Sequence, residues 1–383
     1  MRKLTMLAPL AVAAVALSAC SSAAVGTTGS TSSPQAATTA AAAGCGTTVP
    51  EIAAAAKKEG SVDLIALPDT WANYGGILDS FRKKYGITAT VANPDASSAD
   101  EITAIKTLRG QTGMPEVVDV GASFTQQMID DGYAQAYKPT TWSEIPDNLK
   151  DPAGHWVAAY YGVMSIGVNT TLVKDAPKTF ADLKNPKYKG QIALNGDPRE
   201  AGAAFAAVMA ASLANGGSSD DILPGIQYFS DLKKSGNLEM VKVTKATLLS
   251  GEVPIALDWT YNFPALKPLM KNAGFDLQVT VPQDGVYGGY YAQSVVTQAA
   301  HPCAAELFLE HLVGDDGALG YLQGGAIPAR YATLVKEGKV DATLAANLPD
   351  AKTIAKIAFP TQKQMDAAKA TLAAQWGPMV ADK

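Results

Sequence analysis

The alternation of short apolar runs with amphipathic segments constrains the fold of this chain more than any other feature. Three runs of mostly apolar residues, 62–67, 87–91 and 116–120, alternate with segments whose apolar residues recur at helical spacing, 73–85, 99–109 and 125–131. Gly86 provides a stop signal for the first of these helices. This β-α-β-α-β order predicts an α/β layer with a largely parallel sheet.

A second α/β run follows Tyr160. Its expected strands are 163–168, 191–194, 253–257, 277–281 and 294–297, and its expected helices are 201–215, 222–235, 245–250, 263–273, 301–314 and 362–375. Pro198 and Pro302 suit the first turns of two of these helices. We therefore expect two α/β lobes, with the chain passing between them, and a ligand outside the carboxyl ends of the strands.

The N-terminus has the pattern of an export signal. Arg2 and Lys3 precede an apolar run, 6–16, that is shorter than the roughly 20 residues needed to span a bilayer. This pattern therefore predicts that residues 1–19 are a signal peptide. The ending Leu-Ser-Ala-Cys20 resembles the lipobox of bacterial lipoproteins, and this resemblance implies that Cys20 becomes the first residue and carries lipid, including palmitate. The alternative is an ordinary signal peptide with a chance cysteine.

The segment after Cys20 has no charged or aromatic residue up to residue 44. Ser, Thr, Ala and Gly bury too little apolar surface to offset chain entropy, so residues 20–44 are expected to form a flexible tether. The folded body then begins near Cys45. Cys45 and Cys303 are an even pair in an exported protein, which favours a disulfide, with two buried thiols as the alternative.

Composition excludes several classes of function. A net charge of −5 and a pI near 5.3 argue against a nucleic-acid partner. Three His and three Cys are too few for a zinc cluster, so no metal site or cofactor is expected. A hydrolase triad would need one of those three His, and the chain has no Gly-x-Ser-x-Gly elbow. We therefore expect a binding protein and not an enzyme; an exported hydrolase with paired carboxylates, as in glycosidases, is the less favoured alternative.

Aromatic and acidic residues gather at the ends of the expected strands. The candidate ligand-binding residues are Asp69, Trp71, Tyr74, Asp197, Glu200, Asp258, Trp259, Tyr261, Tyr291 and Gln293. Aromatic faces together with carboxylates make a box for an organic cation. Tyr74 also lies on the apolar stripe of its helix, and Asp197 could simply cap a helix, so core packing and capping remain open for these two. The aromatic residues argue against a purely structural adhesin.

Several motifs resemble those of the spermidine/putrescine-binding proteins of bacterial ABC importers. They are Trp71-x-x-Tyr74 before Phe81-x-x-x-Tyr-Gly-Ile87, Asp197-x-Arg-Glu200, the Trp of Pro254-Ile-Ala-Leu-Asp-Trp259, and Tyr291-Ala-Gln-Ser294. The resemblance implies a two-lobed, type II periplasmic-binding-protein-like α/β fold with a hinge between the lobes. It also implies that these aromatic and acidic residues line the solute site. Where the family has an acid, this chain has Gln293, so one amine partner is missing; Asp258 could replace it.

The resemblance implies a small-molecule solute, captured by hinge closure, and ABC permease subunits as partners. We expect a monomer, lipid-anchored on the extracytoplasmic face of the cell membrane. The expected first lobe comprises residues 45–158 and about 285–325, and the second comprises 159–284 and about 326–383. Two other solutes remain open: a ferric ion, suggested by the adjacent Tyr290 and Tyr291, and a phosphonate-type anion at the helix expected after Pro198.

Overall fold

The computed structural model describes residues 44–357 and 359–382. The predicted signal peptide, the lipidation site at Cys20 and all but the last residue of the tether lie outside the described residues. Within the described ranges, no helix has both the length and the apolar character needed to cross a membrane.

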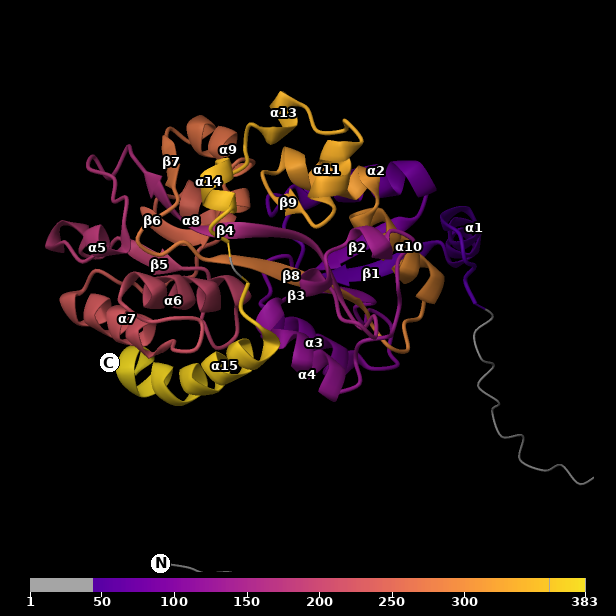
Figure 1. The fold of residues 1–383 in the computed structure, drawn as a ribbon, viewed down its shortest axis with the longest axis horizontal. Helices are drawn as coiled ribbons and strands as arrows, with labels where there is room; N and C mark the ends of the chain where they lie inside the picture. Colours follow the sequence, from indigo (N-terminus) through magenta and orange to yellow (C-terminus); the bar gives the residue numbers. More distant parts are fainter. Residues whose placement is uncertain (1–43, 358, 383) are drawn as a thin grey trace, which may run out of the picture. The chain divides into compact units, whose positions relative to one another are not determined.

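The described residues form an α/β fold (Figure 1). The strands are β1 (Ser61–Ile65), β2 (Thr88–Ala92), β3 (Val117–Gly121), β4 (Val157–Asn169), β5 (Ile192–Leu194), β6 (Ile255–Trp259), β7 (Leu277–Thr280), β8 (Gly288–Val295) and β9 (Ile327–Pro328). The helices are α1 (Val49–Glu59), α2 (Tyr74–Tyr85), α3 (Ser98–Leu108), α4 (Thr125–Asp130), α5 (Phe180–Leu183), α6 (Gly202–Ala214), α7 (Leu223–Ser235), α8 (Lys245–Leu249), α9 (Leu266–Asn272), α10 (Pro302–Val313), α11 (Asp315–Gln323), α12 (Tyr331–Lys336), α13 (Ala342–Ala345), α14 (Ala351–Ile354) and α15 (Gln362–Trp376). Short helical turns are η1 (Ala122–Phe124), η2 (Trp142–Glu144), η3 (Asp147–Leu149), η4 (Pro186–Tyr188), η5 (Thr260–Asn262) and η6 (Gly377–Ala381).

The strands follow the order β2-β1-β3-β8-β4-β6-β5, with β7 and β9 also pairing with β4. The pairs β1–β2, β1–β3 and β5–β6 are parallel, as the β-α-β pattern predicts. The expectation of a largely parallel sheet is nevertheless wrong. The strand β8 inserts between β3 and β4 and runs antiparallel to both, because the chain returns from the second lobe in the opposite direction.

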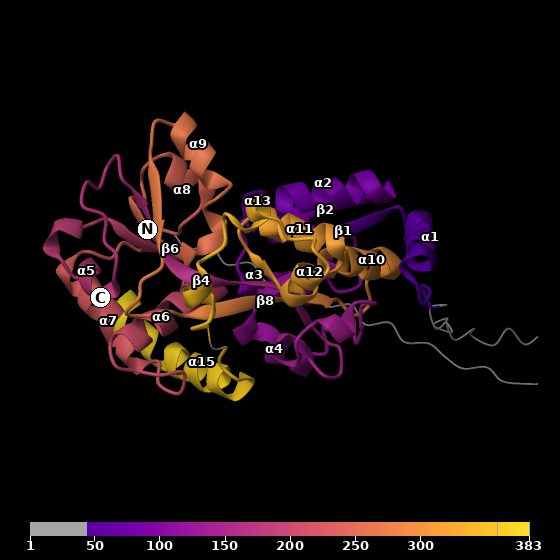
Figure 2. The same ribbon diagram turned by 45° about the horizontal axis from the view of Figure 1, so that its top comes forward.

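The strand β4 connects two lobes. Its residues 157–163 pair with β8, and its residues 164–168 pair with β6. The prediction of a short strand at 163–168 therefore missed the first half of a strand of 13 residues. Figures 1 and 2 show β4 and β8 running from the lobe that holds β1–β3 to the lobe that holds β5–β7. The predicted two-lobed α/β fold is confirmed, while the exact lobe boundaries stay a prediction.

The helix after β5 begins later than its sequence suggests. The backbone N–H of Glu200 donates to the carbonyl of Asp197 at 2.9 Å, which closes a turn around Pro198. The helix α6 starts only at Gly202, and Ala201 occupies its N-cap position. The prediction that Pro198 lies in the first helical turn is therefore wrong, and the capping alternative considered for Asp197 does not describe its position.

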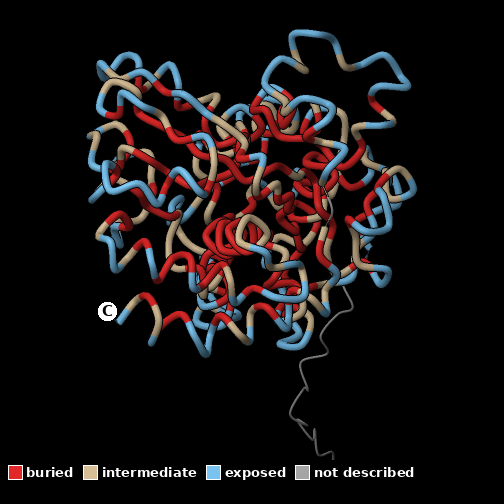
Figure 3. The backbone as a smooth tube through the Cα atoms, turned by 60° about the vertical axis from the view of Figure 1, so that its left-hand side comes forward, coloured by how far each residue is buried: buried red, intermediate tan, exposed pale blue. Residues whose placement is uncertain are grey.

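The interior of the described body is continuous and apolar. Buried residues concentrate at its centre, and exposed ones on the outer turns of the helices (Figure 3). The helix α6 is buried from Gly202 to Ser212, so its Ala-rich sequence serves close packing on every side. The C-terminal helix α15 contacts α7 of the second lobe and η1 of the first. On that helix, the Lys369 ammonium lies 3.7 Å from the ring centre of Phe124.

A disulfide joins Cys45 to Cys303, at the beginning of α10, which confirms the predicted pair. The helices α1 and α10 also pack together, and the Glu59 carboxylate accepts the backbone N–H groups of Cys303 and Ala304 at 3.2 and 2.7 Å. The disulfide and this cap fix the start of the folded body to the first lobe.

We expect the double variant C45S/C303S to lose about 2–5 kcal/mol of unfolding free energy. The bond closes a loop of 258 residues, and its loss returns that loop's entropy to the unfolded chain. Urea denaturation of the oxidised protein and of the variant measures the difference. An unchanged midpoint in the variant would mean that Glu59 and the α1–α10 packing hold this end of the chain without the bond.

Candidate functional site

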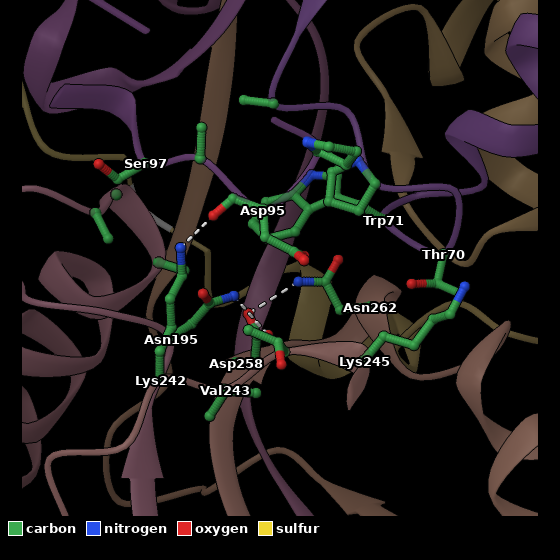
Figure 4. Close-up of a pocket in the computed structure, with 18 of the residues that line it drawn as sticks. Thr70, Trp71, Asp95, Ser97, Asn195, Lys242, Val243, Lys245, Asp258 and Asn262 are labelled. Carbon is green, nitrogen blue, oxygen red and sulfur yellow. Dashed lines mark hydrogen bonds between the residues drawn. The ribbon is translucent and has the colours of Figure 1, made fainter. Parts of the chain in front are cut away.

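A cavity of about 80 Å³ lies between the two lobes. The first lobe contributes the segment after β1, the start of α3 and the end of β3, and the second contributes the end of β6 and the starts of α6 and α8. Figure 4 shows the polar side chains that reach into it. The cavity therefore lies where carboxyl ends of strands from both lobes meet, as the sequence pattern predicts.

Two aromatic rings form one wall of the cavity. Trp71 and Tyr291 both line it, and their ring centres are 5.1 Å apart in an edge-to-face arrangement. The Trp71 indole N–H donates to the hydroxyl of Tyr160 at 2.7 Å, and that hydroxyl donates to Asp119 at 2.8 Å. This chain of hydrogen bonds fixes the orientation of the indole.

Three buried carboxyl groups also line the cavity: Glu101, Asp119 and Asp258, with exposures of 1, 5 and 3%. Their partners are neutral. Glu101 accepts the backbone N–H of Asp119 at 2.9 Å, and Asp258 accepts the side-chain amides of Asn262 and Asn195 at 2.9 and 3.0 Å. Among the ion pairs of the described residues, none involves these three carboxyls.

Burial raises the pKa values of all three carboxyls. The pKa of Asp258 rises to about 6 and that of Asp119 to about 7, because desolvation penalises the charged form more than the neighbouring hydrogen bonds favour it. Burial, together with the nearby Asp119, also raises the pKa of Glu101 well above its ordinary value. A cation in the cavity would lower all three pKa values.

An acceptor without a partner faces the same space. Asn262 is buried and lines the cavity; its amide N–H donates to Asp258, while its Oδ1 has no hydrogen-bond partner within the described structure. Figure 4 shows this oxygen pointing away from Asp258, on the side of Trp71. A buried acceptor of this kind is costly unless a donor reaches it.

Two lysines of the second lobe reach across the edge of the cavity to the first lobe. The Lys245 ammonium lies 2.9 Å from the carboxylate of Asp69, and the Lys242 ammonium donates to the backbone carbonyl of Asp95. The Lys245 side chain is 42% exposed, so these contacts lie nearer to solvent than the three carboxyls. They tie the two lobes together at the cavity's edge.

Comparison with known proteins identifies the family. A family model described as bacterial extracellular solute-binding protein matches residues 113–357. The chain belongs to this family. The family's description places this solute-binding protein outside the cytoplasm, in agreement with the predicted export signal.

Solved structures of similar fold are described with different solutes. A periplasmic binding protein of Actinobacillus pleuropneumoniae, AfuA, with fructose-6-phosphate bound, has a TM-score of 0.65 and 19% identity; the match covers 84% of this chain and 99% of that one. A putative spermidine/putrescine ABC transporter protein of Listeria monocytogenes has a TM-score of 0.60 and 15% identity, covering 83% and 98%. Iron-bound HitA of Pseudomonas aeruginosa has a TM-score of 0.60 and 18% identity, covering 82% and 98%.

Among curated proteins, an uncharacterised protein of Haemophilus influenzae is 26% identical over 268 residues, which are 65% of this chain and 72% of that protein. The solved structures confirm the fold of this solute-binding protein. They do not select its solute, because identities of this size show the fold alone.

The structure brings only part of the predicted site together. Trp71, Asp258 and Tyr291 line the cavity, and Asp69 lies at its edge through Lys245. Four other predicted residues lie in the layer of side chains packed behind these: Tyr74, Trp259, Tyr261 and Gln293, all at most 2% exposed. The Tyr74 hydroxyl accepts a hydrogen bond from Tyr321 at 3.0 Å, so the packing alternative considered for Tyr74 describes its position.

The Asp197–Glu200 motif does not line the cavity. Asp197 accepts the backbone N–H of Arg199 and pairs with its guanidinium at 2.6 Å. Glu200 is exposed, and its carbonyl accepts the N–H of Ala99, at the start of α3. The motif contributes to the contact between the lobes through this backbone bond.

A buried acid of the neighbouring strand lies beside Gln293. Gln293 and Asp119 are directly paired residues of β8 and β3, and the Gln293 amide donates to the Asp119 carboxyl. Its other end accepts the N–H of Ala159 at 2.6 Å. The sequence showed Asp119 as a charge within a mostly apolar run, but nothing local indicated that β8 would lie beside it.

The remaining cavity residues were missed for similar reasons. Asn195 directly follows β5 and Asn262 ends η5, so both fit the strand-end rule, but amides were not counted as candidates. Glu101 lies in the first turn of a helix, where acidic residues are common on protein surfaces, so its position did not indicate a site. Lys242 and Lys245 belong to none of the motifs found in the sequence.

Proposed function

We propose that this protein is the substrate-binding component of an ABC importer and that its solute carries an ammonium group, as polyamines do. The observation that carries the proposal is the set of three buried carboxyls, Glu101, Asp119 and Asp258, which have no cationic partner within the described residues. A buried carboxylate without a counter-charge is costly, and an ammonium solute would supply that charge.

The aromatic wall supports the same class of solute. A cation against the faces of Trp71 and Tyr291 would gain about 0.5–2 kcal/mol per contact. The unpartnered Oδ1 of Asn262 offers an acceptor for an ammonium N–H. Together with charge-assisted hydrogen bonds of about 1.5–3 kcal/mol each, a few such contacts support binding in the micromolar range, about −8 kcal/mol.

Hinge closure is the proposed mechanism of capture. The strands β4 and β8 connect the lobes, and cavity residues come from both sides, so a solute that contacts both lobes favours the closed arrangement. The closed form would then be recognised by permease subunits in the membrane. A monomer held by a lipid on Cys20 and a tether up to residue 44 would stay close to such a permease.

A ferric ion has less support at this site. Of the adjacent tyrosines, Tyr290 stacks on Trp156 with ring centres 5.5 Å apart, while Tyr291 lies against Trp71 in the cavity. Within the described ranges, no group of three or more His, Cys, Asp or Glu residues is placed to hold a metal ion.

The proposal predicts a pH dependence of opposite sign for binding and for stability. The pKa values of Asp258 and Asp119, about 6 and about 7, lie above the ordinary value of 3.8, so the ligand-free folded protein holds more protons than the unfolded chain between these limits. These two carboxyls should therefore make stability fall as pH rises from about 4 to 7, partly offset by the buried His311, whose pKa of about 4 lies below its ordinary value of 6.5. Ammonium binding requires the charged carboxylates. When the pH lies below the pKa of one of these carboxyls, the affinity should fall about tenfold per pH unit for that carboxyl.

Thermal unfolding tests the pH dependence of stability and that of binding in one experiment. The full chain is melted at pH 5 and pH 8, alone and with amines, amino acids or dicarboxylates of two to five carbons. We expect the ligand-free melting temperature to be higher at pH 5, and the stabilisation by amine-bearing solutes to be larger at pH 8. Stabilisation by the dicarboxylates alone would reject an ammonium solute.

A further inference from the structure

The charges of the cavity are separated by depth. The acidic groups Glu101, Asp119 and Asp258 are at most 5% exposed, whereas Lys242 and Lys245 lie at the edge and are partly exposed. Figure 4 shows these two lysines on opposite sides of the hydrogen-bonded pair Asp258 and Asn262. A solute that enters between the lobes therefore meets negative groups inside and positive groups at the edge.

We infer that the solute is a compact zwitterion, with its ammonium at the buried carboxyls and an anionic group at one of the two edge lysines, Lys242 or Lys245. This inference rests on the proposed function, because it assumes that the same cavity captures the solute. It adds the class of the second group: a carboxylate, phosphonate or phosphate carried on the same small molecule.

Lys242 lacks a full counter-charge in the ligand-free protein. Its ammonium donates to the neutral carbonyl of Asp95, and the ion pairs of the described residues do not include it. Ser97 and Ser98 line the cavity close by, but the helix end that they begin is already capped by the Asp100 carboxylate. An anionic group at this edge would therefore gain the charge of the lysine, not that of the helix end.

Lys245 is paired, but weakly held. Its partner Asp69 has a side chain that is 64% exposed, and exposed pairs contribute about 0–1 kcal/mol. An anionic group of the solute could therefore replace Asp69 at small cost. Such an exchange would keep the lysine pointed across the gap and join the lobes through the solute.

A linear diamine fits this arrangement poorly. With one ammonium at Asp258, a second ammonium a few bonds away would approach Lys242 or Lys245, and like charges repel. The cavity, at about 80 Å³, is also small compared with the roughly 300–1,000 Å³ of typical ligand pockets. A short chain with opposite charges at its two ends can pair with the buried carboxyls at one end and with an edge lysine at the other.

Calorimetry with ligands of matched length tests the inference. The three series are α,ω-diamines, ω-amino carboxylates and α,ω-dicarboxylates of two to five carbons, titrated into the full chain at pH 8. We expect the best amino carboxylate to bind at least tenfold more tightly than the diamine and the dicarboxylate of equal length. A diamine that binds as tightly or more tightly would overturn the zwitterion but leave the importer and its ammonium solute intact. Binding by dicarboxylates alone, or by none of the series, would overturn both the zwitterion and the ammonium.

Lysine variants should change the affinities for amino carboxylates and for diamines in opposite directions. One of the variants Lys242→Gln and Lys245→Gln should weaken amino carboxylate binding about tenfold and, because repulsion is removed, tighten diamine binding. Lys271→Gln is the matched control, since Lys271 pairs with Asp276 on the surface of the second lobe and does not line the cavity. Equal changes for both ligand classes, or no change for either, would overturn the role of the lysines.

Discussion

Replacing Asp258 with Asn should weaken solute binding by at least a hundredfold. Asp258 is 3% exposed, and Asn195 and Asn262 orient its carboxylate within the cavity. Removing one partner of a buried, hydrogen-bonded charge pair costs about 2–5 kcal/mol, because the other charge stays buried without compensation. At about 1.4 kcal/mol per factor of ten, the middle of that range corresponds to the expected loss. Calorimetry with the tightest ligand of the matched series measures it.

Asp197→Asn is the matched control. The sequence motif made Asp197 as strong a candidate as Asp258, but its carboxylate pairs with Arg199 outside the cavity. We expect its affinity to stay within threefold of the unsubstituted protein. Asp119→Asn, at the other buried carboxyl, should reproduce the loss seen for Asp258→Asn. Circular dichroism and the melting temperature check that each variant is folded. A folded Asp258→Asn variant with unchanged affinity would remove this carboxyl from the site.

Local structure followed closely from local sequence. The helix α2 ends at Tyr85 because Gly86 adopts a left-handed conformation that other residues avoid, and this stop was predicted. The helix α3 begins at Ser98, one residue before its predicted start, and Ser97 and Asp100 form a capping box there. Strands and helices of this kind depend on neighbours within a few positions, which a single sequence displays.

The order of the strands depends on distant partners, and here the sequence pattern failed. The strand β8 pairs with β3, whose paired residues precede it by 170 to 178 positions, and Gln293 meets Asp119 only because of this register. A β-α-β pattern carries information about parallel neighbours but none about a later strand that inserts between them. The same limit applies to the site. Trp71 could be predicted because it follows a strand in the sequence, whereas Asp119 could be predicted only from the strand that pairs with β3.

The Asp197-Pro-Arg-Glu segment shows a second limit. Acidic residues followed by a long apolar helix predict a cap, yet Asp197 folds back on Arg199 and α6 begins only at Gly202. The small residue at this start has a packing reason. A Cβ on Gly202 would lie 2.9 Å from the backbone of Gly121 and 3.1 Å from the Tyr291 hydroxyl. The close approach of the two lobes at the cavity thus depends on contacts that no local pattern reveals.

Trp259→Ala should destabilise the protein by about 3–5 kcal/mol, the typical cost of deleting a buried aromatic side chain. Trp259 is 2% exposed and stacks on Tyr261 with ring centres 6.0 Å apart. On its other side lies Gly289, where a Cβ would come within 2.5 Å of the indole, so the strand β8 is shaped around this ring. Urea denaturation measures the loss, and Trp142→Ala is the comparison with a smaller expected loss, because its indole is partly exposed.

The same variant distinguishes support of the cavity from contact with the solute. Trp259 does not line the cavity, but it meets Tyr291 edge-to-face with ring centres 6.5 Å apart, and Tyr291 does line it. We therefore expect Trp259→Ala to weaken binding through displacement of Tyr291, and Trp259→Phe to restore most of both stability and affinity. If Trp259→Phe restored stability while affinity stayed more than tenfold reduced, the indole itself would have to contact the solute in the closed form. The cavity would then extend behind Tyr291, and the carboxyls would hold a longer molecule than the compact zwitterion inferred from the present lining.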